Sequence, residues 1–245
     1  MKFMKKLFAV LSLSAVASLT TAQDNNQIDP KLTEFWEPVP AVVTPDPVPS
    51  DAIVLFDGTN LEAWKGKDGP APWTVKNGYM TVNPGKGGIS TKQSFCDMQL
   101  HIEWRVPEKT PGKEGQQQNN SGVFLQGRYE VQVLDSYENR TYSNGQAGSV
   151  YKQSLPLVNA MKPPTHWNTY DIIFKAPRFS ESGELTSKAH VTVLHNGVLV
   201  QNHTEIQGGT TYRGQPSYSA HGCAPIFLQD HGNYVSFKNI WVREL

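Results

Sequence analysis

Residues 73–83, WTVKNGYMTVN, decide the fold class of this chain. Alternating side chains flank Asn77-Gly78, and Asn-Gly is the favoured central pair of a type I′ turn. The stretch is expected to form a tight β-hairpin, because the twist of this turn matches that of two antiparallel strands. A second Asn-Gly pair at 196–197 predicts another tight hairpin.

Short apolar or alternating stretches, separated by turn residues, fill most of the chain from about residue 53. They are IVLF, MQLHIEWRV, SGVFLQG, YEVQVLD, NTYDIIFKA, APIFLQDHG and VSFKNIWVREL. No long segment has the 3.6-residue apolar period of a helix. Many short strands with frequent turns predict an all-β domain, a jelly-roll sandwich of two antiparallel sheets. Five strand residues are expected in its interior: Trp104, Val131, Val133, Ile172 and Phe174.

The first 22 residues have the composition of a secretory signal peptide. Three lysines precede a largely apolar stretch at 7–19, and small residues at 20–22 suit cleavage before Gln23. The alternative is a membrane anchor, but the apolar stretch is short for a membrane span. We therefore expect export to the periplasm or the extracellular space, and no membrane span in the rest of the chain.

Residues 23–52 are rich in proline and are expected to run extended before a domain that covers 53–245. The chain has 245 residues, 38% of them hydrophobic, which suits one large β domain or two small ones. Removal of residues 1–22 leaves 19 basic and 22 acidic residues, a net charge of about −3. This balance gives no sign of nucleic acid or an anionic membrane as a partner.

The two cysteines, Cys96 and Cys223, leave two alternatives. An exported chain can oxidise such a pair to a disulfide. Sequence alone does not show that the two residues meet, so two buried free thiols are the other alternative.

Residues 129–136, YEVQVLDS, place a carboxylate and an amide together on one face of a predicted strand, Glu130 and Gln132. Two further strands place ionisable or amide groups on one face: His101, Glu103 and Arg105 in the first, Gln229 and His231 in the second. A solvated outer face would show the same pattern. Such faces usually favour Lys and Thr, which these lack, so a binding site is the preferred interpretation. Glu103, Glu130 and Gln132 are then expected to line one concave face together.

Three long polar loops interrupt the strands, at 107–121, at about 136–167 and at about 205–222. Loops of this length in a compact domain are usually functional or disordered. The second and third are rich in Tyr, Asn, Gln and Gly. Amide groups and aromatic faces of this kind suit the hydroxyls and rings of a sugar.

Four long motifs resemble one known family. They are NSGVFLQGRYEVQVLDSYENRTYSNGQAGSVYKQSLPLVNA from residue 120, HWNTYDIIFKAPRF from 166, VTVLHNGVLVQNH from 191 and PIFLQDHGNYVSFKNIWVREL from 225. From about residue 53 to 245 the chain is similar to the family long called DUF1080, the 3-keto-disaccharide hydrolase domain. The resemblance implies a concanavalin A-like, glucanase-type sandwich, export by a bacterium, and action on oligosaccharides or other glycosides already oxidised at C3.

The reaction that this resemblance implies begins at an acidic C–H bond. A ketone at C3 acidifies the hydrogen on C2, so a general base can remove it and form an enolate. The enolate expels the C1 oxygen, and water then adds to the enone, which gives net hydrolysis. Such a site needs a base, an acid for the leaving group and an electrophile for the enolate oxygen.

Polar residues of the strands and loops described above are candidates for these roles. The candidates for proton transfer or for holding a metal are Glu103, Glu130 and His231. The candidates for substrate binding are Asn120, Arg128, Gln132, Asp135, Tyr151 and Gln229. No cofactor is required. A divalent metal held by carboxylates and histidine is one option for the electrophile, although no compact ligand spacing such as HExxH occurs.

Two other functions fit the same residues. A conventional retaining glycoside hydrolase would use Glu103 and Glu130 as a carboxylate pair about 5–5.5 Å apart. A carbohydrate-binding module would need aromatic platforms and no base. An assay that offers a glucoside and its 3-keto form separates the three functions.

Overall fold

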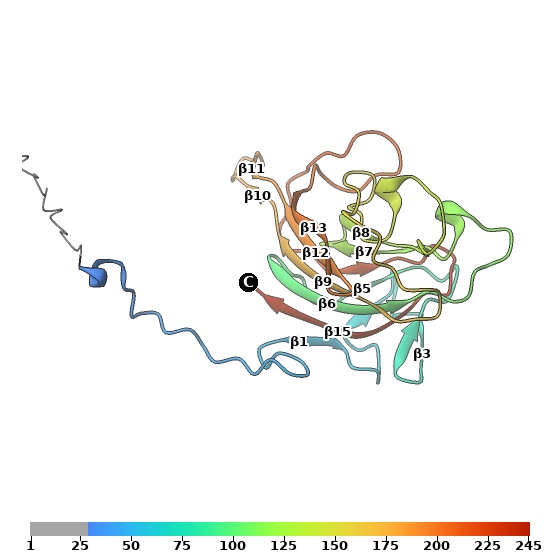
Figure 1. Ribbon diagram of the computed structural model, residues 1–245, viewed down its shortest axis with the longest axis horizontal. Coiled ribbons are helices and arrows are strands. Elements are labelled where there is room, and N and C mark those ends of the chain that lie inside the picture. Colours follow the sequence, from blue (N-terminus) through green and yellow to red (C-terminus); the bar gives the residue numbers. More distant parts are fainter. Residues whose placement is uncertain (1–28) are drawn as a thin grey trace, which may run out of the picture. The chain divides into compact units, whose positions relative to one another are not determined.

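Antiparallel strands make up nearly all the regular structure of the computed structural model, which describes residues 29–245 (Figure 1). The strands are β1 (Ile53–Phe56), β2 (Trp64–Lys65), β3 (Thr74–Lys76), β4 (Tyr79–Thr81), β5 (Ile89–Thr91), β6 (Met98–Arg105), β7 (Ser121–Leu125), β8 (Tyr129–Val133), β9 (Asn168–Lys175), β10 (Arg178–Phe179), β11 (Leu185–Ser187), β12 (His190–His195), β13 (Val198–Glu205), β14 (Phe227–Leu228) and β15 (Ser236–Glu244). Within 29–245 the helices are three short 3-10 turns: η1 (Pro30–Thr33), η2 (Gly115–Gln117) and η3 (Ser143–Gly145). The predicted all-β class is confirmed.

The chain divides into two compact units, one that ends at Val42 and one that spans Val43–Leu245. The described part of the first unit holds η1 and exposed extended chain. The signal peptide predicted at 1–22 lies outside the described residues. Across residues 29–245, no helix combines the length and the apolar character needed to cross a membrane.

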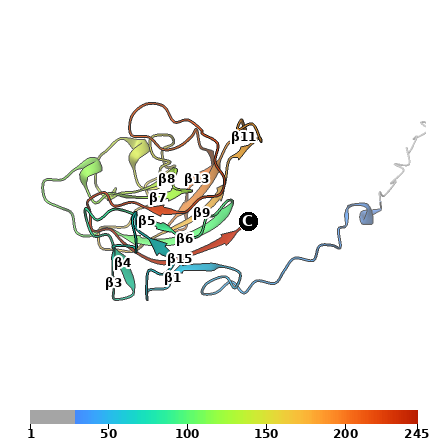
Figure 2. The same cartoon turned by 180° about the vertical axis from the view of Figure 1, so that it is seen from behind.

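Two antiparallel sheets form the sandwich in the second unit. The larger sheet has eight strands in the order β13-β12-β9-β6-β15-β4-β3, with β1 paired to β15. The smaller sheet has five strands in the order β2-β5-β14-β7-β8, and β10 and β11 form a separate ribbon. Seen from both sides, β7 and β8 lie over the curved larger sheet (Figures 1 and 2).

Both predicted hairpins are confirmed. Asn77 and Gly78 connect β3 to β4 with φ angles of 54° and 78°. Asn196 and Gly197 connect β12 to β13 with φ angles of 53° and 78°. Positive φ at both central residues defines the type I′ turn, and Asn and Gly are the residues that adopt it at least cost.

Alternation along the strands builds the core between the two sheets. Every second residue of β6 is buried, and the residues between them are partly exposed. All five residues predicted for the interior are at most 1% exposed: Trp104, Val131, Val133, Ile172 and Phe174. The rings of Tyr129 on β8 and Phe174 on β9 lie 5.8 Å apart between centroids, so they contact across the sheets.

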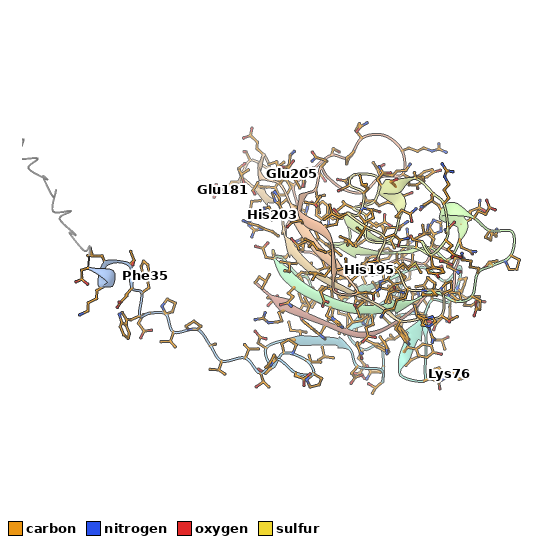
Figure 3. All side chains as sticks on the ribbon, in the orientation of Figure 1. Phe35, Lys76, Glu181, His195, His203 and Glu205 are labelled. Atoms are coloured by element: carbon orange, nitrogen blue, oxygen red, sulfur yellow. A yellow bond between two sulfur atoms is a disulfide. The ribbon has the colours of Figure 1, made fainter. Side chains whose placement is uncertain are left out.

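His195 on β12 is fully buried in this core (Figure 3). Its Nε2 lies 3.1 Å from Asn168 Oδ1, and its ring packs on Tyr170. Burial lowers the pKa of His195 to about 3, so the imidazole is neutral at physiological pH. Its role is therefore structural, as a hydrogen-bonded core side chain.

Cys96 and Cys223 form a disulfide that joins positions 127 residues apart in the sequence. The bond connects the chain just before β6 to the end of the loop 205–222. Of the two alternatives that the sequence leaves open, the structure therefore has the bonded one. One end of this loop is thus fixed covalently to the sandwich.

Candidate active site

A pocket of about 270 Å³ opens on the face of the five-stranded sheet that points away from the core. We call it the inner pocket. Its lining residues are Asn120, Phe124, Glu130, Gln132, Tyr151, Thr210, Tyr212, Gln229 and His231. Six of the nine predicted site residues lie here: Asn120, Glu130, Gln132, Tyr151, Gln229 and His231. The strands β7 and β8, the turn after β14 and all three long loops bring the lining residues together.

The period of β8 explains how a core strand contributes to this pocket. Its odd-numbered residues enter the core, and Glu130 and Gln132 point to the opposite face. The register with β7 sets Phe124 opposite Glu130 and Gly122 opposite Gln132. The second face of YEVQVLDS is therefore the floor of a pocket and not a solvated surface.

A segment of the loop 136–167 lies along the other edge of β8 and covers this floor. Gly148 N donates to Gln132 O at 3.0 Å, and Tyr151 N donates to Glu130 O at 3.1 Å. These bonds place Tyr151 beside the strand. The floor itself is buried: Glu130 is only 4% exposed and Gln132 only 1%.

Glu130 is a buried carboxylate, and the ion pairs found within residues 29–245 do not include it. With its NH2 group turned toward the carboxylate, the Gln132 amide donates to Glu130 Oε1 at 3.0 Å and to Ser121 O at 2.9 Å. Burial raises the pKa of the Glu130 carboxyl from 4.5 to about 8. The side chain can therefore gain and lose a proton near neutral pH, which is what a general base requires.

Two amide side chains line the pocket beside this carboxylate. Asn120 Nδ2 donates to Gln116 O at 2.8 Å, which fixes the Asn120 side chain. Gln229 is held through its main chain, because its N donates to Gly122 O at 3.0 Å. The Gln229 Oε1 atom is buried and has no hydrogen-bond partner in the described part of the chain. An unpaired buried acceptor is costly to the fold, and the Gln229 side chain as a whole lines the inner pocket.

His231 lies on the rim of the inner pocket and is exposed. The prediction that it shares a strand face with Gln229 is wrong, because β14 ends at Leu228 and both residues follow the strand. Asp230 shapes this turn: its two carboxylate oxygens accept from Gly87 N (2.9 Å) and from Gly232 N (2.8 Å). His231 therefore reaches the pocket from a fixed turn.

Tyrosines from the two long loops form the outer wall of the pocket. The hydroxyls of Tyr142 and Tyr151 lie 2.6 Å apart. Burial raises the pKa of both phenols, so each holds its proton at neutral pH. Lys152 Nζ lies 4.3 Å from the centroid of the Tyr212 ring and donates to Tyr212 O at 2.7 Å. This contact joins one loop to the other.

Four residues at the site were not predicted individually from the sequence: Phe124, Tyr142, Thr210 and Tyr212. For the three loop residues, the sequence signal was the composition of the two loops, which suits sugar binding. Composition does not indicate which residues of a loop face the pocket.

Glu103 lies outside the inner pocket, on the outer face of the eight-stranded sheet. There it pairs with Lys238 Nζ at 3.3 Å and accepts a hydrogen bond from Asn239 Nδ2. Glu130 points outward from the other sheet. The prediction that Glu103 and Glu130 line one face is therefore wrong. Alternation shows which residues of a strand share a face, but β6 and β8 belong to different sheets.

Arg128 and Asp135 do not line the inner pocket either. Arg128 Nη1 donates to Gln126 O at 3.0 Å in the turn between β7 and β8. Its main-chain O accepts from Thr210 N at 2.8 Å, so it anchors the loop that carries Thr210. Asp135 is fully buried after β8, where burial raises its pKa and Tyr137 N donates to its Oδ1 at 3.3 Å.

Comparison with known proteins agrees with this fold. The sequence model of the 3-keto-alpha-glucoside-1,2-lyase-like domain matches residues 51–243. The chain belongs to this family. A relative from Bacteroides thetaiotaomicron, named 3-keto-disaccharide hydrolase, is 25% identical over an alignment that covers 81% of this chain and 80% of the relative.

Solved structures extend the comparison of this 3-keto-alpha-glucoside-1,2-lyase-like domain. A crystal structure from Parabacteroides distasonis, described as a candidate glycosyl hydrolase, is 54% identical with a TM-score of 0.85 and covers 89% of this chain and 97% of its own. A second structure from the same organism is 20% identical, with a TM-score of 0.57, and the match covers 80% of this chain and 94% of the other. The second likeness shows a shared fold.

The lining of the inner pocket limits the chemistry of this 3-keto-alpha-glucoside-1,2-lyase-like domain. Glu130 is the one carboxylate among the lining residues. Within residues 29–245 no three His, Cys, Asp or Glu side chains gather as a metal-binding group would. The pocket therefore offers one carboxylate, one imidazole, several amides and two phenols, which can move protons and bind hydroxyls.

Proposed function

We propose that this chain cleaves glycosides that carry a ketone at C3 of the sugar, by elimination across C1 and C2 followed by hydration. The observation that carries the proposal is Glu130, a buried carboxylate with a pKa raised to about 8, in a pocket lined by amides and phenols. Family membership and the name of the B. thetaiotaomicron relative support the same substrate class.

The first step is proton abstraction by Glu130. Its carboxylate takes the C2 hydrogen that the neighbouring ketone acidifies, and the electron pair becomes an enolate. Thr210 Oγ1 already accepts from Glu130 N at 3.0 Å, so its own proton can point to the developing oxyanion. The Gln229 amide is the second group that can bind this oxygen or a neighbouring hydroxyl.

The second step is cleavage of the C1–O bond. The enolate electrons form the C1–C2 double bond, the bond to the leaving oxygen breaks, and that oxygen takes a proton. Tyr151 is the proposed acid, because its phenol stays protonated at neutral pH and its hydroxyl lies 2.6 Å from that of Tyr142. Water then adds at C1, and a proton returns to C2, which completes net hydrolysis.

A conventional retaining glycosidase has less support. It needs two carboxyl groups about 5–5.5 Å apart. Glu130 is the one carboxylate that lines the inner pocket, and Glu103 points outward from the other sheet. A non-catalytic carbohydrate-binding module would not need a buried carboxylate with a raised pKa, which is costly to the fold.

The test compares one α-glucoside with its 3-keto form, using the wild-type chain and Glu130→Gln. Cleavage of the 3-keto form alone by the wild-type chain, with loss in the variant, is the expected result. Cleavage of both forms would indicate a conventional hydrolase. Binding of either without cleavage would indicate a binding module.

We also propose that the chain is exported and that residues 53–245 form the catalytic domain. The composition of residues 1–22 supports export. Sequencing of the mature N-terminus after expression in a bacterium tests this. The expected first residue is Gln23, and an unprocessed Met1 would contradict export by this signal.

A further inference from the structure

Gln116 lies in the short turn η2, outside the lining of the inner pocket, and connects the floor of that pocket to the loop that covers it. Its Nε2 donates to Gly145 O at 2.8 Å and to Thr141 Oγ1 at 3.2 Å. On its other side, its Oε1 lies 2.8 Å from the side-chain amide of Gln132. Gln132 in turn contacts Glu130, so Gln116 is two side chains away from the proposed base.

Neighbouring residues hold Gln116 in this position. Asn139 fixes the preceding residue, because Gly115 N donates to Asn139 Oδ1 at 2.8 Å and Asn139 Nδ2 donates to Gly115 O at 3.0 Å. A Cβ built at Gly145 would lie 2.8 Å from Gln116 Nε2, closer than Cβ atoms approach their neighbours in practice. A larger residue at Gly145 would therefore displace the Gln116 amide.

The Gln132 amide has two hydrogen-bonding orientations, and each serves a different acceptor. With its NH2 group toward Glu130, it donates to Glu130 Oε1 at 3.0 Å and to Ser121 O at 2.9 Å. Its oxygen then lies 2.8 Å from Gln116 Oε1. With its NH2 group toward Gln116, it donates to Gln116 Oε1 at 2.8 Å, and its oxygen then faces the Glu130 carboxyl and Ser121 O. Both donor hydrogens sit on one nitrogen, so Glu130 and Gln116 compete for them.

The charge on Glu130 decides between the two orientations, because each leaves one contact between two oxygens, with Gln116 in the first and with Ser121 in the second. An ionised carboxylate only accepts hydrogen bonds, so it holds the NH2 group, whereas a protonated carboxyl donates to the amide oxygen. Ionisation of Glu130 therefore takes the NH2 group away from Gln116. Reversal of the Gln116 amide would not relieve the contact, since its oxygen would then meet Gly145 O. The Gln116 oxygen thus opposes ionisation of Glu130.

We propose that Gln116 is a positioning residue for the base, whose oxygen competes with Glu130 for the NH2 group of Gln132 and so makes Glu130 a better proton acceptor. This rests on the proposed function. As the C2–H bond breaks and the Glu130 O–H bond forms, the Gln132 amide turns its NH2 group to Gln116, which favours the transfer. Burial of Glu130 acts in the same direction.

Other titratable groups surround Glu130. Tyr151, Tyr212 and His231 line the same pocket, and the hydroxyl of Tyr142 lies 2.6 Å from that of Tyr151. Strand β7, which pairs with β8, contributes no titratable side chain. Because the phenols and the imidazole can also shape a pH–rate profile, the test must observe the Glu130 carboxyl directly.

The first measurement is the pKa of Glu130, from the carbon-13 NMR signal of its side-chain carboxyl, which is assigned by its loss in Glu130→Gln. Gln116→Met replaces the amide by a thioether of similar length, which is only a weak acceptor. Gln116→Glu keeps an acceptor that faces Gln132. Gln117→Met, at the exposed next residue of η2, is the matched control.

In Gln116→Met the pKa of Glu130 should fall by about 1, because the Gln132 NH2 group can then stay on the carboxylate, and a hydrogen bond to a charged group is worth about that much. Gln116→Glu should not lower this pKa, and Gln117→Met should leave it unchanged. If Gln116 only supported the fold, Gln116→Met would lower the Tm and not the pKa. An unchanged pKa in Gln116→Met, or an equal fall in Gln117→Met, would overturn the proposal. Gln116→Asn, which is shorter by one methylene, replaces Gln116→Met if that variant does not fold.

The pH–rate profile on a 3-keto glycoside separates failure of this proposal from failure of the proposed function. In Gln116→Met the rise of kcat/KM should move to lower pH and its plateau should fall, because a carboxylate of lower pKa is a weaker base. The expected NMR shift without cleavage of any 3-keto glycoside by the wild-type chain would support the competition and contradict the proposed function. Cleavage by the wild-type chain without an NMR shift in Gln116→Met would overturn the role of Gln116 alone.

Discussion

The Glu130 carboxylate lies over Gly122, in space that only a residue without a side chain leaves open. A Cβ built at Gly122 would lie 2.5 Å from Glu130 Oε1 and 2.8 Å from Phe124 Cε2. Gly122 pairs with Gln132 and is two pairs removed from Glu130 in the β7–β8 register, so the carboxylate leans along the floor of the pocket. The position of the proposed base therefore depends on a glycine of the neighbouring strand.

Gly122→Ala should displace the base while leaving the core in place. Misplacement of a catalytic group by about 1 Å can reduce the rate about a hundredfold. We expect kcat to fall about a hundredfold. The free energy of unfolding should fall by at most about 3 kcal/mol, because extra atoms in a packed site typically cost about 1–3 kcal/mol. Gly69→Ala is the control variant, because nothing lies within 4 Å of a Cβ at that position. Reaction rates and urea unfolding are measured for both variants. Full activity in Gly122→Ala would mean that the Glu130 position is not critical.

Glu130→Gln should lose activity by a factor of about 10²–10⁴, the usual contribution of a general base. It should not lose stability. The folded-state pKa of Glu130 is raised from 4.5 to about 8, so between these values the folded chain keeps a proton that the unfolded chain has released. Below pH 4.5 the Glu130 carboxyl is protonated in both states and does not lower the free energy of unfolding. As the pH rises from 4.5 toward about 8, the free energy of unfolding of the wild-type chain falls, because unfolding lets Glu130 release its proton. In thermal melts, the Tm of Glu130→Gln should rise relative to that of wild type as the pH increases from about 5 to about 8. A variant that melts lower than wild type throughout would indicate a structural role.

The pH–rate profile should show the same group. Because the carboxylate form is the base, kcat/KM should rise with pH and level off above an apparent pKa near 8. Measurement with a 3-keto glycoside between about pH 6 and pH 9 reports the free enzyme. A profile that is flat across this range would assign the proton abstraction to another group.

The sequence was sufficient to predict the long strands and the core, but it missed the short strands β2, β5, β10 and β11 and failed where contacts cross between sheets. Alternation identified Trp104 and Val131 as interior and placed Glu130 and Gln132 on one face, because the side-chain period of a strand is local. It could not show that β6 and β8 belong to different sheets, so Glu103 was grouped with Glu130. The pairing of strands that are distant in the sequence depends on the whole fold, so the sequence of a single strand does not indicate which sheet it joins.

Turns and loops account for the remaining differences. FLQDHG reads as an alternating strand, yet β14 covers two residues, because Asp230 turns the chain through bonds to main-chain nitrogens. Tyr142, Thr210 and Tyr212 lie in loops without a period, and their positions depend on contacts such as Lys152 Nζ with Tyr212 O. Composition could identify these loops as functional, but geometry was needed to select the residues.

Tyr151→Phe should slow the reaction according to the leaving group. An alcohol of a sugar needs a proton as it leaves, so its cleavage should fall about a hundredfold. A 3-keto nitrophenyl glucoside has a leaving group that departs as an anion, and its cleavage should be nearly unchanged. His231→Asn tests the exposed rim residue in parallel. If His231→Asn slows cleavage of the sugar leaving group but not of nitrophenol, and Tyr151→Phe slows neither, the acid is His231.

The last prediction concerns the hydrogen on C2, which elimination removes and direct displacement at C1 does not. In heavy water, the sugar product should carry deuterium at C2 because a solvent deuteron returns to that carbon when the enone is hydrated. A substrate deuterated at C2 should also react more slowly, since that bond breaks in the first step. Mass spectrometry and NMR of the product, and rates of the labelled substrate, measure the two effects.

Two controls make this result specific, because a 3-keto sugar can exchange its C2 hydrogen without cleavage. The free 3-keto sugar is incubated in heavy water with and without the chain, and incorporation during turnover must exceed both. Glu130→Gln, at matched conversion, should remove the excess if Glu130 is the base. No excess deuterium together with equal rates for the labelled and unlabelled substrates would exclude the enolate route and would favour direct displacement at C1 in the inner pocket.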